Sequence, residues 1–253
     1  MKNKKYFFAF AYLLLVLAIC SCAVPLPVVR LVTEDVPNSA KRYWFGSEQV
    51  FLTHEGVDIV VSFSECTPSD LIFLIEVINR SENDVLVEPE KIYYESFKQL
   101  DSVKTRIVPH YVSAYDPEEK ILRIDKEQSV RDAEDANNQA FNTVVSLISI
   151  TADVSASLSK NDTQQARQER DNDRREQEAD YQDQRNDYLN ATQSLNEKRE
   201  YWANTTLRKT HLPSNNSMQG TVLIPRNDKA THLKLVIPIG EVNFVVDYKQ
   251  NLH

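Results

Sequence analysis

The sequence predicts an α+β protein in which a long helical hairpin is inserted into an antiparallel β-sandwich. Three patterns support this fold class. Short apolar strands separated by turn residues occupy residues 43–117, and similar strands return in residues 213–253. Between them, residues 118–212 contain neither proline nor glycine, although the chain has ten and four of these residues. Because both residue types interrupt helices, their absence over this length favours helix.

The two β regions show the spacing of half-buried strands. Val57, Ile59, Val61 and Phe63 alternate with mostly polar neighbours, which is the period-two pattern of a strand with one buried face. Gly240 permits a tight turn between the last two strands. Together the regions hold 116 residues, close to the roughly 100 of one immunoglobulin-like sandwich. The remaining expected strands cover residues 71–78, 85–89, 92–97, 103–108, 221–224, 233–237 and 242–248.

The first helix of the hairpin has a clear start and one broad apolar face. Asp116 is a suitable N-cap, Pro117 suits the first helical position, and Glu118 and Glu119 suit the positive end of the helix dipole. A face this wide is typical of a buried helix, so we expect it between the sandwich and the second helix. The β-branched residues within 141–158 leave a strand there as an alternative. The face comprises Phe141, Val144, Val145, Ile148 and Ala152, widened by Leu147, Val154 and Leu158.

The second helix is expected over residues 163–206, after a turn at residues 159–162. It is highly charged, and four of its large apolar residues stand exactly seven apart. This single narrow seam suffices to lie against another helix but is too weak to specify a free coiled-coil dimer. The mixed charges of residues 168–185 indicate a solvated face. The seam consists of Tyr181, Tyr188, Leu195 and Trp202.

The N-terminal residues 1–21 have the order of an export signal peptide. Lys2, Lys4 and Lys5 precede an apolar run over residues 6–19, which as a helix would rise only about 21 Å, short of the roughly 30 Å hydrocarbon core. The following Ile19-Cys20-Ser21-Cys22 resembles the lipobox of bacterial lipoproteins. This resemblance implies lipidation of Cys22 and anchoring to a bacterial membrane of the cell envelope, with the outer membrane favoured. The alternative is an ordinary cleaved signal peptide.

The net charge of the chain that remains after the expected cleavage limits the kinds of molecule that it can bind. Removing residues 1–21 removes three lysines, so 26 basic residues face 37 acidic ones and the net charge is −11. Such a charge disfavours nucleic acid and broad contact with anionic lipid headgroups.

Residues 22–42, with prolines at 25, 27 and 37, are expected to form a flexible tether. With Cys22 acylated only Cys66 remains, so no intramolecular disulfide is expected and Cys66 should be a structural residue at a strand end.

Two segments resemble the immunoglobulin-like domains found in many lipoproteins of Bacteroides-type bacteria. The first is Glu76-Val77-Ile78-Asn79-Arg80-Ser81, continuing through residues 85–89. The second runs from Leu212-Pro213 through Gly220-Thr221-Val222 and is followed by residues 233–248. The resemblance covers roughly 110 residues and implies a fold and a location. It implies no catalytic residues, and it leaves the helical hairpin unexplained.

The sequence lacks the motifs that several kinds of catalytic and binding site require. The glycines stand only at positions 46, 56, 220 and 240, so neither a phosphate-binding loop nor a G-x-S-x-G nucleophile turn occurs. The five histidines are scattered, without metal-ligand spacing. We therefore expect a protein that is not an enzyme and that binds no cofactor or metal.

Two function classes remain. The first is a scaffold or protein-interaction lipoprotein whose hairpin contacts another envelope protein, with Tyr181 and Tyr188 as candidate contacts. The second is a glycan-binding module, which would use Tyr43, Trp44, Tyr93 and Tyr94 of the sandwich. Exposure of these rings discriminates between them, because a solvent-facing coplanar pair favours glycan. An exposed apolar strip on the hairpin favours a protein partner.

Overall fold

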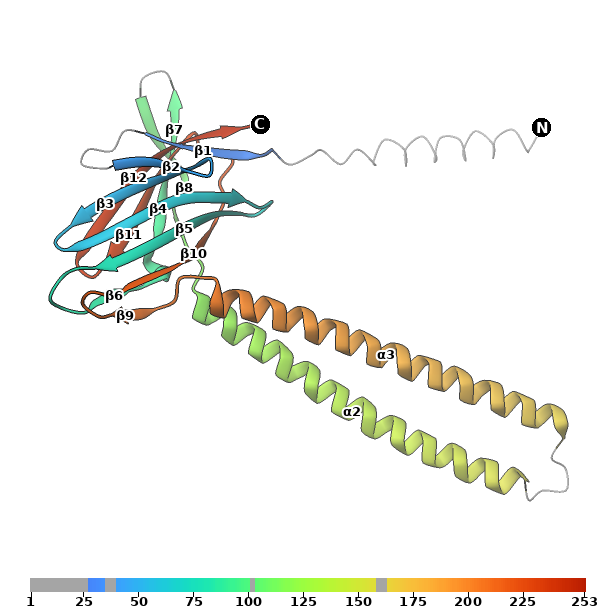
Figure 1. The fold of residues 1–253 in the computed structure, drawn as a ribbon. Helices are drawn as coiled ribbons and strands as arrows, with labels where there is room; N and C mark the ends of the chain where they lie inside the picture. Colours follow the sequence, from blue (N-terminus) through green and yellow to red (C-terminus); the bar gives the residue numbers. More distant parts are fainter. Residues whose placement is uncertain (1–26, 35–39, 101–102, 158–162) are drawn as a thin grey trace, which may run out of the picture.

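The protein is a mixed α+β molecule with two antiparallel sheets and two long helices (Figure 1). The computed structural model describes residues 27–34, 40–100, 103–157 and 163–253. The sheets pack face to face in a sandwich-like body, and the helices project from it as an arm. The helices lie between β8 and β9 in the chain, with strands of both sheets on either side. The α+β class with antiparallel sheets, predicted from the sequence, is therefore confirmed.

The five-stranded sheet places β10 at the edge nearest the arm. Its order is β10-β5-β4-β3-β2, with every neighbour antiparallel. In β4 the predicted alternation holds for Val57, Ile59 and Val61, which are buried. It ends there, because Ser62 is also buried and the pairing with β5 becomes irregular between Phe63 and Glu65. β5 is apolar on both faces, as expected for a central strand. The bounds are β2 (Ala40–Trp44), β3 (Ser47–His54), β4 (Val57–Cys66), β5 (Asp70–Asn79) and β10 (Ser217–Pro225).

The seven-stranded sheet is built around β11. One edge of β11 pairs with β12, which in turn pairs with β1. The other edge pairs with β7 along residues 232–236 and with β6 at Ile239. The bounds are β1 (Val29–Thr33), β6 (Val85–Val87), β7 (Tyr93–Leu100), β8 (Val103–Ser113), β9 (Thr210–Leu212), β11 (His232–Ile239) and β12 (Val242–Leu252), with a 3₁₀ turn at η1 (Pro89–Lys91).

The hydrophobic core lies between the two sheets. Phe73 of β5 and Tyr248 of β12 meet across it, with ring centroids 5.7 Å apart. Fully buried aliphatic residues of both sheets surround this pair. The core therefore belongs to the sandwich, which has its own apolar interior independent of the arm. Its fully buried aliphatic members include Ile59, Val61, Ile75, Leu235, Ile237 and Val246.

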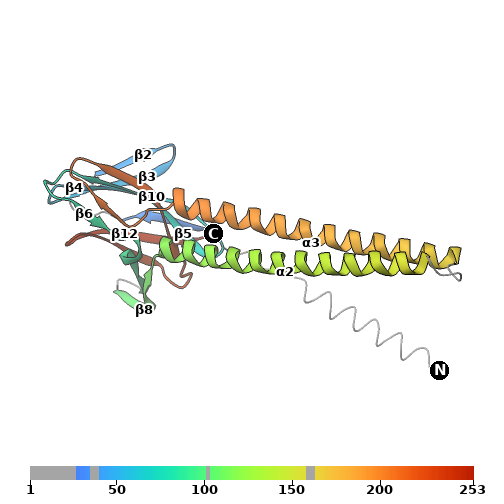
Figure 2. The same cartoon turned by 90° about the horizontal axis from the view of Figure 1, so that it is seen from below.

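The two helices, α2 (Pro117–Ser157) and α3 (Gln164–Asn204), run antiparallel along the arm (Figure 2). Asp116 caps α2, since its Oδ1 accepts a hydrogen bond from the backbone N–H of Glu118 at 2.8 Å. The predicted helix start is thus confirmed. The alternative of a strand within residues 141–158 is wrong for residues 141–157, which are helical. Among the helices of the described residues, none is long and apolar enough to cross a membrane.

Two predicted boundaries are wrong. Residues 29–33 of the expected tether form β1, in which Val29, Leu31 and Thr33 face the core while the residues between them face outward. Prolines at 25, 27 and 37 lie on both sides of this short alternation, and they led to the prediction of an extended tether instead of a strand. The sandwich therefore begins at residue 29 rather than 43. The hairpin ends at Asn204 rather than 212, since residues 210–212 form β9.

Candidate functional site

The arm is attached to the edge strand β10 by backbone hydrogen bonds. The N–H of Leu207 donates to the carbonyl of Thr221 at 2.9 Å, and the N–H of Thr221 donates to that of Thr205 at 2.8 Å. On the α2 side, the N–H of Tyr115 donates to the carbonyl of Leu223 at 3.0 Å. Gly220 allows this approach, because a Cβ at that position would lie 2.3 Å from the nitrogen of Leu207. Both ends of the arm are therefore fixed to the same strand.

Side chains reinforce the base of the arm. The guanidinium of Arg208 donates to both carboxylate oxygens of Glu118, at 2.5 and 2.6 Å, and this pairing lowers the pKa of Glu118. The rings of Tyr115 and Trp202 meet edge to face at 6.2 Å. The ammonium of Lys120 lies 3.9 Å above the Tyr115 ring. These contacts join the first turn of α2 to the end of α3.

The face of α2 that meets α3, here called the inner face, becomes polar with distance from the sandwich. Ile121, near the base, is buried. Farther out, Gln128 contacts Thr192 at 3.3 Å and Asp135 pairs with Arg185 at 2.9 Å. Around the Asp135–Arg185 pair, polar side chains of both helices line a cavity of about 150 Å³. The inner face consists of Ile121, Ile124, Gln128, Arg131, Asp135, Asn138, Asn142 and Val145.

The opposite side of α2, here called the outer face, is apolar and exposed. The expectation that the face around Phe141 is buried against the sandwich or α3 is wrong, because α3 covers the inner face and the sandwich lies at the base of the arm. Only Val145 of the predicted face is half-buried. Ala152, Val154 and Leu158 have side chains outside the described residues. The exposed fractions are 68% for Phe141, 53% for Val144, 59% for Leu147 and 61% for Ile148.

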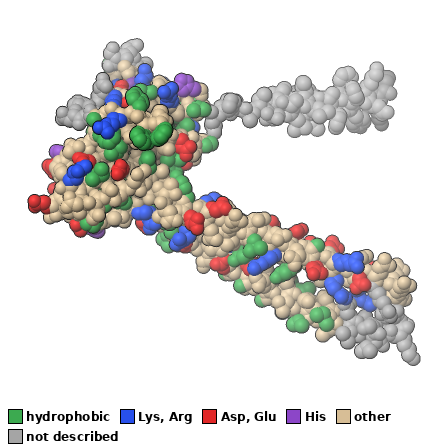
Figure 3. Space-filling model, in the orientation of Figure 1, with side chains coloured by type: hydrophobic (Ala, Val, Ile, Leu, Met, Phe, Trp, Pro, Cys, Tyr) green, Lys and Arg blue, Asp and Glu red, His purple; other side chains and the backbone are tan. Residues whose placement is uncertain are grey.

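The outer face also carries a seven-residue repeat that the sequence analysis missed. Val130, Asn137, Val144 and Thr151 are spaced seven apart, and Ala133, Ala140 and Leu147 lie between them at the second position of a heptad. All seven are exposed. The spacing is visible in the sequence, but the 3.6-residue period that joins Val145 and Ala152 to Phe141 masks it. Figure 3 shows hydrophobic side chains between charged ones along the arm.

The aromatic candidates of the sandwich are not brought together. Tyr43 and Trp44 lie at the end of β2 and are 75% and 65% exposed. Trp44 meets Phe45 edge to face at an interplanar angle of 82°. Tyr93 is half-buried and packs on Tyr111, with ring centroids 5.6 Å apart. No flat pair of rings is formed among these residues.

Three other candidate tyrosines serve internal contacts. Tyr94 is fully buried and donates to the carbonyl of Pro225 at 2.7 Å, so its selection as a surface contact is wrong. The alternation in the sequence does not show which of Tyr93 and Tyr94 faces the core, because the two adjacent residues are both tyrosine. Tyr181 and Tyr188 are half-buried and line the cavity between the helices. The hydroxyl of Tyr188 donates to Asp132 at 2.8 Å, which raises the pKa of Tyr188.

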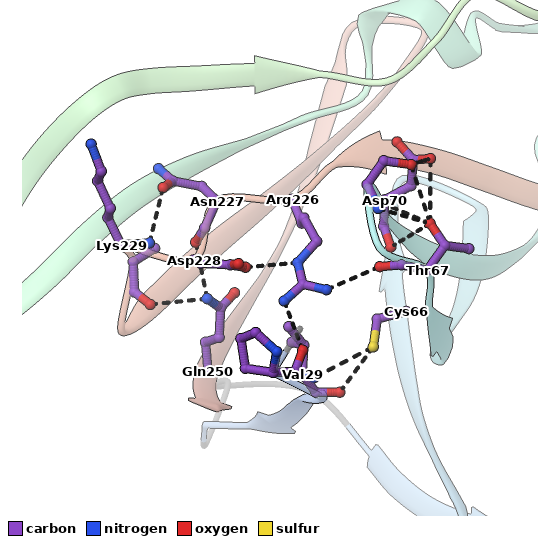
Figure 4. Close-up of polar contacts among 12 residues, drawn as sticks. Val29, Cys66, Thr67, Asp70, Arg226, Asn227, Asp228, Lys229 and Gln250 are labelled. Atoms are coloured by element: carbon purple, nitrogen blue, oxygen red, sulfur yellow. Dashed lines mark hydrogen bonds and ion pairs between the residues drawn. The ribbon is translucent and has the colours of Figure 1, made fainter. Parts of the chain in front are cut away.

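A polar cluster fixes the start of β1 to the sandwich (Figure 4). The nearly buried guanidinium of Arg226 donates to the carbonyl of Pro27 at 2.9 Å and to that of Thr67 at 3.0 Å, and pairs with Asp228. The Sγ of Cys66 lies 3.4 Å from the N–H of Val29 and 3.5 Å from its carbonyl oxygen. Cys66 is thus a strand-end residue with backbone partners, as predicted.

The last candidate, Cys22, lies outside the described residues. Within the described parts of the chain, no group of three His, Cys, Asp or Glu residues is placed to hold a metal ion. Comparison with protein-family models, with curated proteins and with solved structures finds no match to this chain. The candidate site with a defined geometry is therefore the outer face of α2.

Proposed function

We propose that this protein is a lipid-anchored lipoprotein of the bacterial cell envelope that acts as a non-enzymatic scaffold or protein-interaction module. In this proposal Cys22 carries the anchor and the sandwich is an immunoglobulin-like domain. The two helices are an insertion in that domain and present the contact surface. The inner face of α2 fixes the arm, and the outer face binds an envelope protein.

The exposed outer face is the observation that carries the proposal. Large apolar side chains on a solvent-facing strip are costly to solubility and mark interaction surfaces. Phe141, Val144, Leu147 and Ile148 form such a strip, and residues 136–152 contain no charged residue. The facing helix α3 is by contrast rich in charges of both signs. An apolar strip placed away from α3, its neighbouring helix within the described residues, supports a role in recognition rather than in holding the arm together.

The anchor rests on the sequence of residues 1–22 and agrees with how the chain enters the sandwich. The contacts of Arg226 with Pro27 and of Cys66 with Val29 hold the segment that follows the proposed anchor. Several acyl chains would retain the protein firmly, whereas one chain binds only weakly. The acyl chains alone would hold the protein at the membrane, so its acidic surface need not touch anionic headgroups.

The proposal is tested with the full-length chain in solubilised envelope membranes. Phe141→Ser/Ile148→Ser should reduce the apparent mass of the native complex, whereas the matched control Leu189→Ser, an exposed apolar residue of α3, should not. Cys22→Ala should abolish labelling by a palmitate analogue and release the protein from the membrane fraction. An unchanged complex in the double variant, or surviving label in Cys22→Ala, would refute the corresponding part.

Glycan binding is the second candidate, favoured by the exposure of Tyr43 and Trp44. Sugars stack on flat aromatic faces, and these two residues are consecutive in a strand, so their side chains point to opposite sides. The edge-to-face packing of Trp44 on Phe45 offers no shared plane. Trp44→Ala should therefore leave retention on envelope polysaccharide unchanged, and a lost retention would favour the glycan function.

A further inference from the structure

We propose that the partner of the outer face is a second copy of this chain, and that the two α2 helices pair as a parallel two-stranded coiled coil. The inference rests on the proposed function, since it names the occupant of the same surface. It concerns residues 130–151, where the outer face has its heptad repeat. In the described structure all seven residues of the repeat are exposed, on the side of α2 opposite the inner face.

The residue types of the repeat favour two strands. The first heptad position holds Val130, Val144 and Thr151, which are β-branched, and Leu147 occupies the second position. β-Branched residues at the first position with leucine at the second favour two-stranded coiled coils. Ala133 and Ala140 occupy the remaining second positions, and their small side chains allow the helices to approach closely.

Asn137 favours identical chains in parallel. It is the one strongly polar side chain among these seven seam positions, which also include Val130 and Thr151. In a parallel pair of identical helices, first-position residues face their own counterparts, so the two Asn137 amides can hydrogen-bond to each other. In an antiparallel pair each amide would face an apolar second-position residue and lose its partner. A single such asparagine also fixes the register.

Charge complementarity supports the same occupant. Without residues 1–21 the chain has a net charge of −11, so two copies repel each other as a whole. Residues 136–152 of the arm carry no charge, so this segment of two copies can meet without repulsion between like charges. Flanking positions that would meet across a parallel pair combine Ala136 with Phe141, Thr143 with Ile148 and Ser129 with Glu134, so no like charges oppose.

The size of the strip predicts a weak dimer. Residues 130–151 extend over about 33 Å of helix, and a helix is about 10 Å wide. A stable interface buries about 800 Å² per partner, so a strip of this size belongs to the low end of the range. Parallel pairing places both sandwiches at the same end of the arms, which is compatible with two anchors in one membrane. Confinement to one membrane would then raise the effective concentration.

The test places single cysteines on the full-length chain in its membrane. Ala133→Cys and Leu147→Cys lie at equivalent heptad positions fourteen residues apart. After mild oxidation, both should give a reductant-sensitive dimer of twice the chain mass. An antiparallel pair can bring together at most one of these positions with its counterpart. Ser146→Cys, exposed on the same helix but off the repeat, and the wild type with Cys66 should give only background dimer.

A disrupting variant completes the test. Val144→Glu added to Ala133→Cys should lower the dimer yield at least about tenfold, because a buried carboxylate pair costs more than the 1.4 kcal/mol that corresponds to tenfold. The matched control Ser146→Glu should leave the yield unchanged. Adducts of another mass at both positions would overturn self-pairing while keeping the proposed protein contact. Background yield at both positions would overturn self-pairing, whereas the protein contact itself is tested by the Phe141→Ser/Ile148→Ser variant. Dimer at one position alone would overturn the parallel arrangement.

Discussion

At the scale of single residues, Gly220 determines whether the arm can sit on β10. A methyl group there would lie 2.3 Å from the Leu207 nitrogen and 2.6 Å from the carbonyl carbon of Thr206, both backbone atoms that cannot rotate away. Gly220→Ala should therefore lower the free energy of unfolding by about 1–3 kcal/mol, the usual cost of overpacking. Denaturant unfolding measures this. Gln219→Ala, at the exposed neighbouring position, should change it by less than about 0.5 kcal/mol, and equal stabilities of the two variants would contradict the steric role.

His232 links the stability of the sandwich to pH. Burial, assisted by the positive charge of Lys104, lowers the pKa of His232 below its ordinary value of 6.5, although the carboxylate of Glu34 lies 3.3 Å from Nε2 and acts in the opposite direction. Between the lowered pKa and 6.5, the unfolded chain binds more protons than the folded one. This contribution to stability is therefore complete above pH 6.5 and decreases as pH falls through that window.

The variant His232→Gln isolates this effect, because a neutral amide cannot take up the proton. Its free energy of unfolding should change less than that of the wild type between about pH 7.5 and about pH 5. Denaturant titrations at the two pH values give both differences. Equal differences in the two proteins would mean that His232 does not account for the pH dependence.

At the scale of elements, the two faces of α2 have different roles. Ile121 of the inner face is 9% exposed, whereas Phe141 of the outer face is 68% exposed. In the monomer, Ile121→Ala should destabilise by about 2–5 kcal/mol, since it leaves a cavity at the base of the arm. Phe141→Ala should change stability by less than about 0.5 kcal/mol. Thermal or denaturant unfolding at concentrations below self-association checks this, and a large loss for Phe141→Ala would show that its ring is buried after all.

The sequence predicted the helices and strands better than it predicted which residues pack against them. Helix over residues 118–157 followed from missing prolines and glycines, and its start followed from Asp116 and Pro117, because these effects are local. The apolar face around Phe141 was also recognised, but what covers it depends on the direction of the arm, which no local pattern encodes. Likewise, alternation predicted a strand at β4 but could not choose between Tyr93 and Tyr94 for the buried side. The short β1 was missed because its prolines suggested a tether.

At the scale of the whole molecule, the apolar core lies in the sandwich, whereas the proposed contact surface lies on the arm. The sandwich holds the apolar core, and the arm joins it through the edge of β10, Gly220 and the Arg208–Glu118 pair. Beyond this base, contacts between the helices are mainly polar, so the distal arm contributes little apolar burial. A platform that is stable by itself can carry an extension whose surface is free for a partner.

Trimming the arm tests this division most directly. Gln128 and Thr192 lie in contact, so a short Gly/Ser turn can replace residues 129–191 and keep the base intact. The trimmed chain should unfold cooperatively, with a stability close to that of the monomeric wild type, and sedimentation of the solubilised full-length proteins should show the native complex reduced to a single copy. Loss of the folded sandwich on trimming, or a complex of unchanged size, would contradict the assignment of recognition to the arm.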